Sequence, residues 1–206
     1  MHLETIDFYN QNAEELTARY LRADRSELQR ILRQWIPLGG SVLEIGCGCG
    51  LDAVFMASIA DKVTATDASD EMLHQAKRII EKHGMSHSIL FKRAVFPLEP
   101  ENPLLKEQFD VIVCIATLMH IPDNELFDFA YQIRSMLKNQ GIFICSFPAD
   151  GGQSHDDQRL YVDREPAEIS LLFERLRFHL LKNEKSQDGL GRAINWTTSI
   201  FCSGGD

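Results

Sequence analysis

Apolar runs of strand length alternate with stretches of helical period along this chain from Val42 onward. Between 42 and 147 these runs are separated by segments long enough for helical crossovers, which predicts parallel pairing with helices on both faces of the sheet. Two later runs, joined by the short turn QDGLGR, are expected to pair antiparallel. The predicted strands are 42–45, 63–66, 89–91, 111–115, 142–147, 178–185 and 193–202. The pattern therefore predicts an α/β fold that ends in a hairpin.

Capping residues mark the expected helices. Ser69 can cap a helix that Gly84 ends, and Pro166 can begin a later one. Asp24 with Glu27 resembles a capping box. Another helix is expected from Asp123, after a proline, with five inward residues: Leu126, Phe127, Ala130, Ile133 and Leu137.

The 206 residues fit one domain, with 44% apolar and 25% charged residues. No apolar run approaches the roughly 18 residues that cross a bilayer, and the polar start MHLETIDFYNQNAEEL lacks the pattern of a secretory signal. We therefore expect a cytoplasmic protein with free cysteines. The net charge of −9 argues against a nucleic-acid binder.

The segment VLEIGCGCGLD places Gly46, Gly48 and Gly50 directly after a predicted strand. Such a turn lets backbone approach a ligand closely. The dinucleotide fingerprint G-x-G-x-x-G would need a glycine at Leu51, and the Gly-Lys-Ser/Thr of a triphosphate loop is absent. The Cys-x-Cys pair in the loop has no further ligand at zinc spacing, so small filler residues are the favoured interpretation.

The motif E-I-G-C-G-C-G resembles the first motif of the class I S-adenosylmethionine-dependent methyltransferases, and the resemblance runs from about Phe8 to Phe201. It implies a Rossmann-like methyltransferase fold, with a doubly wound, seven-stranded, mostly parallel sheet and a C-terminal antiparallel hairpin. It also implies S-adenosyl-L-methionine as the cofactor and S-adenosyl-L-homocysteine as the product. By this resemblance Asp67, at the end of the second strand in VTATDASDEML, accepts hydrogen bonds from both ribose hydroxyls.

The same resemblance implies the remaining cofactor-binding positions. Ala68 and Met72 would lie near the adenine. The family usually carries an Asp or Asn after the third strand, where this chain has Ala94 and Val95, so either backbone groups bind the adenine amine or cofactor affinity is weak. The full set expected to bind the cofactor is Glu44, Gly46, Cys47, Gly48, Gly50, Asp67, Ala68, Met72, Ala94, Val95, Ile115, Ala116 and Tyr20.

The chain is expected to be a single methyltransferase domain, 1–206, with three parts that have different roles. Residues 1–38 form an N-terminal helical layer or lid, 39–147 the cofactor-binding core, and 148–206 a C-terminal helix and hairpin on the substrate side. In the lid, Tyr9 and Tyr20 either cover the cofactor or simply pack the N-terminal helix.

His120, in L-M-H-I-P, is the candidate general base; the alternative is a loop histidine that bonds backbone or shapes the pocket. Trp196 and Arg192 either line a substrate pocket or belong to an amphipathic strand.

The expected reaction is transfer of a methyl group to a small-molecule acceptor by in-line displacement. The D/N/S-P-P-Y/F/W motif of DNA amino-methyltransferases does not occur at 115–117, so nucleic acid is disfavoured. One alternative is a non-catalytic, cofactor-binding sensor or partner module, and another is a nicotinamide-dependent oxidoreductase. The acceptor and the oligomeric state stay open.

Overall fold

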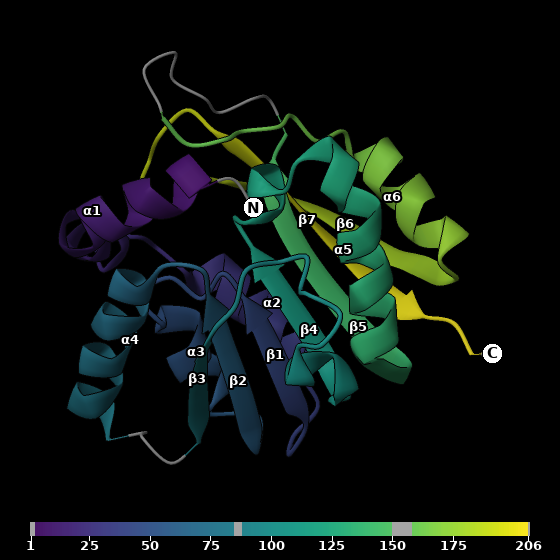
Figure 1. Ribbon diagram of the computed structural model, residues 1–206, viewed down its shortest axis with the longest axis horizontal. Helices are drawn as coiled ribbons and strands as arrows, with labels where there is room; N and C mark the ends of the chain where they lie inside the picture. Colours follow the sequence, from purple (N-terminus) through teal and green to yellow (C-terminus); the bar gives the residue numbers. More distant parts are fainter. Residues whose placement is uncertain (1–2, 85–87, 150–157, 206) are drawn as a thin grey trace.

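The fold is taken from a computed structural model, which describes residues 3–84, 88–149 and 158–205 (Figure 1). Its strands form one sheet in the order β3-β2-β1-β4-β5-β7-β6. The bounds are β1 Ser41–Ile45, β2 Lys62–Asp67, β3 Ile89–Arg93, β4 Phe109–Ile115, β5 Leu137–Pro148, β6 Phe178–Gln187 and β7 Asn195–Ser203. Strands β1 to β5 pair in parallel, and β7 runs antiparallel to both β5 and β6. This confirms the predicted fold class.

Helices cover both faces of the sheet (Figure 1). Alternate residues of β4 enter two separate cores: Val111 and Val113 pack on the side of α2, α3 and α4, while Ile112 and Cys114 pack on the side of α5 and α6. Strands buried on both faces are expected to be apolar, as β4 is from Val111 to Ile115. The helix bounds are α1 Leu3–Tyr20, α2 Ser26–Trp35, α3 Leu51–Met56, α4 Asp70–His83, α5 Asp123–Met136 and α6 Pro166–Arg175, with short 3-10 turns η1 Pro103–Lys106 and η2 Leu118–His120.

The caps of α4 form as predicted. Ser69 accepts a hydrogen bond from the backbone N–H of Met72, and Gly84 is left-handed at the C-terminal end. The prediction of a capping box at the start of α2 was wrong. Arg25 occupies the N-cap position, and its side chain makes no capping hydrogen bond. Asp24 instead accepts a hydrogen bond from the backbone N–H of Ser26.

The prediction for the inner face of α5 was wrong at Phe127, and Leu137 is buried as predicted but belongs to β5. Phe127 is 56% exposed, and Phe129 is buried in its place. Leu137 begins β5 and pairs with Phe109, because the chain passes from helix to strand with no loop between them. None of the helices within the described ranges combines the length and apolar character that a membrane crossing requires.

Candidate functional site

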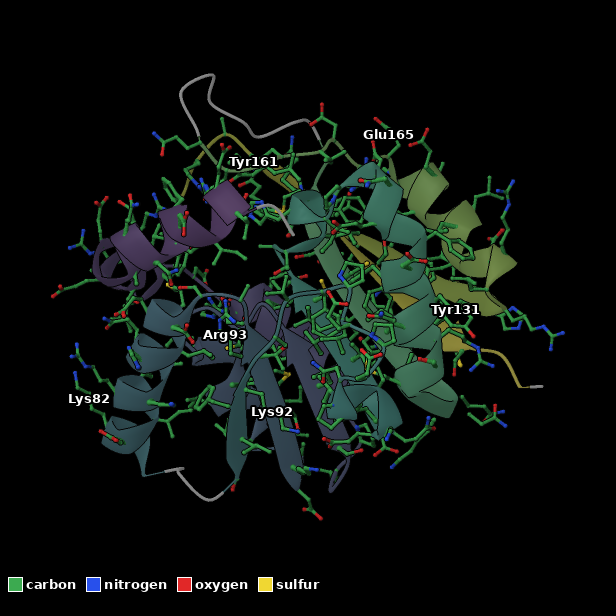
Figure 2. The ribbon with its side chains drawn as sticks, viewed as in Figure 1. Lys82, Lys92, Arg93, Tyr131, Tyr161 and Glu165 are labelled. Atoms are coloured by element: carbon green, nitrogen blue, oxygen red, sulfur yellow. The ribbon has the colours of Figure 1, made fainter. Side chains whose placement is uncertain are left out.

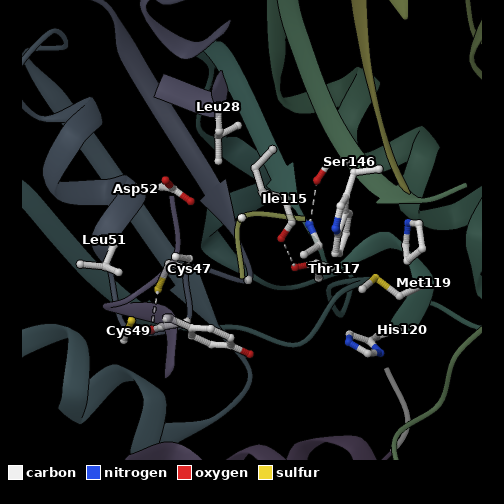
Figure 3. Close-up of a pocket in the computed structure, with 18 of the residues that line it drawn as sticks. Leu28, Cys47, Cys49, Leu51, Asp52, Ile115, Thr117, Met119, His120 and Ser146 are labelled. Carbon is white, nitrogen blue, oxygen red and sulfur yellow. Dashed lines mark hydrogen bonds between the residues drawn. The ribbon is translucent and has the colours of Figure 1, made fainter. Parts of the chain in front are cut away.

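A cavity of about 300 Å³ opens at the carboxyl ends of β1, β2 and β4. Its walls come from the glycine loop, the ends of these strands, α1 and the C-terminal hairpin. Figure 3 shows Cys47 and Cys49 on one side of the cavity and Met119 and His120 on the other. Ligands of open α/β sheets bind at this edge, where the strand order reverses between β1 and β4.

The three glycines of the loop share left-handed backbone, with φ of 74°, 53° and 80° at Gly46, Gly48 and Gly50. They differ in what surrounds them. A side chain at Gly46 would overlap Thr117, and one at Gly50 would come within 2.9 Å of the Ala76 methyl group. At Gly48 the nearest atom is the terminal methyl of a methionine at 3.5 Å. Only Gly48 therefore leaves space for a ligand, and the other two make room for protein.

Asp67 ends β2 with its carboxylate turned toward the loop. One oxygen accepts from the backbone N–H of Gly48 at 2.8 Å, and the other accepts from that of Ser69 at 2.9 Å. Burial raises the pKa of Asp67, although these N–H groups work in the opposite direction. A carboxylate offers about four lone-pair sites, so Asp67 retains acceptor capacity beside these backbone bonds.

The rim after β4 is held in an unusual conformation. Ala116 has a φ of 52°, which is left-handed, and its N–H donates to the Ser146 hydroxyl at 3.1 Å (Figure 3). Non-glycine residues in this region concentrate at functional sites. The strained residue brings Thr117 against Gly46 and leaves Ile115 and Ala116 in the cavity wall.

Ten of the thirteen predicted cofactor-binding residues line the cavity: Gly46, Cys47, Gly48, Asp67, Ala68, Met72, Ala94, Ile115, Ala116 and Tyr20. The other three do not. Gly50 packs on α4, Val95 lies outside the wall that Ala94 and Phe96 form, and Glu44 is only 2% exposed. Burial and the nearby Asp52 raise the pKa of Glu44 well above its usual range.

His120 lines the cavity at the end of η2 and is 2% exposed. Its Nδ1 lies 2.6 Å from the Leu160 carbonyl oxygen, and its Nε2 lies 3.0 Å from the Tyr9 hydroxyl. A carbonyl only accepts, so Nδ1 carries the hydrogen, and in the neutral ring the Nε2 lone pair accepts from Tyr9. The Tyr9 oxygen also accepts from Arg159 Nη1 at 3.1 Å.

Several residues of the cavity wall were missed from the sequence. Arg25 donates from Nε to Asp52 at 3.1 Å, which forms an ion pair beside the glycine loop. Arg159 and Tyr161 reach the same cavity from a loop far along the chain. The position of Asp52 at the end of the glycine motif could have identified it, whereas no local sequence feature indicates Arg25, Arg159 or Tyr161.

Arg192 and Trp196 both line the cavity, and both bind Asp188. The Arg192 guanidinium donates twice to this carboxylate, and the indole N–H donates at 3.1 Å. These bonds fix the turn of the β6–β7 hairpin. Cys47 and Cys49 are buried free thiols, and no cluster of three potential metal ligands forms among the described residues.

Comparisons with known proteins place these features in a wider group. Residues 42–141 match a family described as "Methyltransferase domain". The ubiquinone biosynthesis O-methyltransferase of Actinobacillus pleuropneumoniae serotype 5b (strain L20) is 30% identical over 110 residues, which cover 52% of this chain and 45% of that protein. Its counterpart from Xanthomonas oryzae pv. oryzae (strain PXO99A) is 32% identical over 85 residues, covering 41% and 34%. The chain thus spans less than half the length of these curated relatives.

Solved structures resemble the whole chain. The DhpI–SAH complex has a TM-score of 0.70 at 22% identity, covering 98% of this chain and 97% of that one. The [4+2]-cyclase SpnF has a TM-score of 0.78 at 14% identity, covering 98% and 95%. A Haloferax volcanii putative methyltransferase, in complex with the Trm112 activator, has a TM-score of 0.80 at 14% identity, covering 98% of both chains. At these identities the likeness extends to the fold alone.

Proposed function

We propose that this chain is a class I S-adenosylmethionine-dependent methyltransferase, which transfers a methyl group from S-adenosyl-L-methionine to a small-molecule acceptor. The observation that carries the proposal is the pairing of the Asp67 carboxylate with the open backbone of Gly48 in the cavity wall. A nucleoside can lie against a bare backbone segment, while a carboxylate that can accept further hydrogen bonds suits a cis-diol.

The cofactor supplies an already activated methyl group on a sulfonium, so the chain mainly has to bind and orient. Asp67 would hold the ribose, and the apolar wall formed by Met72, Ala94 and Phe96 would take the adenine. The Ala94 N–H already donates to the Asp67 carbonyl, so it is not available to an adenine ring nitrogen. The adenine amine donates, and backbone carbonyl oxygens there could accept from it. Holding two reactants in line can lower the barrier by about 7–11 kcal/mol.

The acceptor end of the cavity supports a small molecule. Tyr161, Trp196 and Met119 give it apolar surface beside the charged side chains of Arg159 and Arg192. The net charge of −9 disfavours a nucleic-acid substrate. The partial relatives carry names of ubiquinone biosynthesis O-methyltransferases, which supports a hydroxyl as the acceptor group. His120 is the proposed base on which the proton of the methyl acceptor ends. The core expected at 39–147 would bind the cofactor, and the described part of 148–206 would contribute to the acceptor side of the cavity.

The second candidate is a cofactor-binding module without catalysis. It is favoured by one observation, the absence of an acidic or amide side chain at Ala94 and Val95 after β3. Transfer of label from methyl-labelled cofactor into the small-molecule fraction of a cell extract separates the two. Label in small molecules supports the enzyme, and tight binding without any transfer supports the module.

The role of Asp67 is tested by titration calorimetry with S-adenosyl-L-homocysteine. Hydrogen bonds to charged groups contribute about 1.5–3 kcal/mol each, so Asp67→Ala should weaken binding at least tenfold. Asp128→Ala, an exposed carboxylate on α5, is the control and should bind as the wild type does. Circular dichroism checks that Asp67→Ala is folded. A folded variant with unchanged affinity would remove Asp67 from the proposed site.

A further inference from the structure

We propose that Tyr9 is the residue that takes the acceptor's proton, and that it passes its own proton to His120 in the same step. This inference rests on the proposed methyl transfer and names its proton pathway. Both side chains line the cavity, and a hydrogen bond of 3.0 Å joins the Tyr9 hydroxyl to His120 Nε2. Tyr9 lies in α1 and His120 in η2, and the two residues are 111 positions apart in the sequence.

The hydrogen bonds of His120 leave its basic nitrogen covered. Nδ1 is committed to the Leu160 carbonyl at 2.6 Å, so the only lone pair of the neutral ring is at Nε2. That lone pair faces the Tyr9 hydroxyl, and the ring is 2% exposed. The Tyr161 ring closes another side, with centroids 4.8 Å apart. An acceptor in the cavity would have to displace Tyr9 before it could touch Nε2.

The Tyr9 oxygen has the bonding capacity that this pathway needs. A phenol offers one hydrogen and two lone pairs. The hydrogen goes to His120 Nε2, and one lone pair accepts from Arg159 Nη1 at 3.1 Å. The second lone pair can accept the hydrogen of an acceptor hydroxyl. Tyr9 can therefore contact the acceptor and His120 at the same time.

The step balances without any other reactant. The lone pair of the acceptor oxygen forms a bond to the methyl carbon while the carbon–sulfur bond of the donor breaks, and its electron pair stays on sulfur. The acceptor proton moves to the Tyr9 oxygen as the Tyr9 proton moves to His120 Nε2. One positive charge leaves the donor sulfur, and one appears on the imidazolium. The Leu160 carbonyl, which accepts from Nδ1–H, stabilises this charge.

The charges around Tyr9 favour a relay over a free phenolate. Arg159 lies over the rings of Phe8, Tyr9 and Tyr161 at 4.7, 5.5 and 4.9 Å. Its positive charge stabilises negative charge that develops on the Tyr9 oxygen. Burial, together with Tyr20 and Tyr161, nevertheless raises the pKa of Tyr9 far above its usual range. Tyr9 thus stays protonated at rest, and the pathway serves acceptors that arrive with a proton, such as hydroxyl groups.

The first test follows the rate of label transfer into the small-molecule fraction that the wild type methylates. General acid–base catalysis contributes about 10²–10⁴-fold, so Tyr9→Phe should lose about that much near neutral pH. It should recover as the pH rises and the acceptor ionises. Tyr131→Phe is the matched control, because Tyr131 is 58% exposed on α5, away from Tyr161 (Figure 2). Equal rates for Tyr9→Phe and wild type at every pH would overturn the relay.

Binding of S-adenosyl-L-homocysteine separates a failure of the relay from a failure of the proposed function. For Tyr9→Phe we expect the rate to fall much more than the affinity. A loss confined to affinity would make Tyr9 a lid residue and overturn the relay. A wild type that binds the product and methylates nothing would instead contradict the proposed enzyme.

Nitrogen NMR of histidine-labelled protein supplies a readout that needs no acceptor. The His120 signals, assigned with His120→Asn, should report hydrogen on Nδ1 and an accepting Nε2. In Tyr9→Phe the Nε2 signal should shift toward that of an unbonded lone pair. Hydrogen found on Nε2 in the wild type would overturn the proposed pathway.

Discussion

At the scale of single residues, the glycines of the loop lack a side chain for two different reasons. Gly46→Ala places a methyl group against Thr117, whereas the methyl group of Gly48→Ala makes only an ordinary contact, 3.5 Å from the terminal methyl of Met72. Both changes put alanine in left-handed backbone, which costs roughly 1–2 kcal/mol. We therefore expect Gly48→Ala to fold and to bind S-adenosyl-L-homocysteine more weakly than the wild type. Gly46→Ala should lose considerably more stability than Gly48→Ala. Urea denaturation and calorimetry measure the two effects.

The overlap at Gly46 is checked by a double-mutant cycle with Thr117→Ala. Residues in contact show coupling of about 0.5–3 kcal/mol, so the double variant should be more stable than the sum of the single changes predicts. Additive losses would show that Thr117 is not the obstacle. The loop itself was predictable from its spacing, but the distinct surroundings of Gly46 and Gly50 were not, since Thr117 and Ala76 come from later segments.

At the scale of elements, Ser69 joins two helices. Its hydroxyl accepts from the Met72 N–H at 3.1 Å and donates to the Asn10 side chain of α1 at 2.7 Å. Removing an N-cap costs about 0.5–2 kcal/mol, so Ser69→Ala should lower the free energy of unfolding by that amount or slightly more. Ser58→Ala, which removes an exposed hydroxyl bond to a backbone carbonyl, should change it by less than about 0.5 kcal/mol. Equal losses would contradict a capping role.

Elements with local signals were predictable, and those that depend on tertiary contacts were not. Ser69 and Gly84 mark α4 because capping is a short-range interaction. At α5, periodicity could not choose between Phe127 and Phe129, because the inner face depends on where the helix sits on the sheet. Arg159 and Tyr9 meet across 150 positions, and no spacing in the sequence signals such a contact.

At the scale of the whole molecule, the stability of the fold is affected by an acidic residue buried in the central sheet. Glu44 lies in β1, and its Oε2 has no hydrogen-bond partner among the described residues. Burial raises the pKa of Glu44 first, and Asp52 adds to the effect, while Arg25 opposes it. The folded chain therefore holds a proton on Glu44 at pH values where the unfolded chain, with a pKa of about 4.3, has released it.

This difference makes stability depend on pH with a definite sign. Where the folded state binds more protons than the unfolded state, the free energy of unfolding falls as the pH rises. Because of Glu44, the free energy of unfolding should therefore fall as the pH rises from about 4.3 to the raised pKa of this residue in the folded state. Glu44→Gln keeps the shape and cannot ionise, so its stability relative to wild type should increase with pH across this window. Urea denaturation at several pH values measures the trend.

Glu14→Gln is the matched control, because Glu14 is an exposed residue of α1. Its stability relative to wild type should stay nearly constant over the same pH range. A constant difference between Glu44→Gln and wild type would mean that Glu44 is ionised in both states, and would place a compensating cation beside it. The first acid of the motif would then be a charged group buried beneath the cavity, and Glu44→Gln should weaken binding of the positively charged cofactor more than binding of its uncharged-sulfur product.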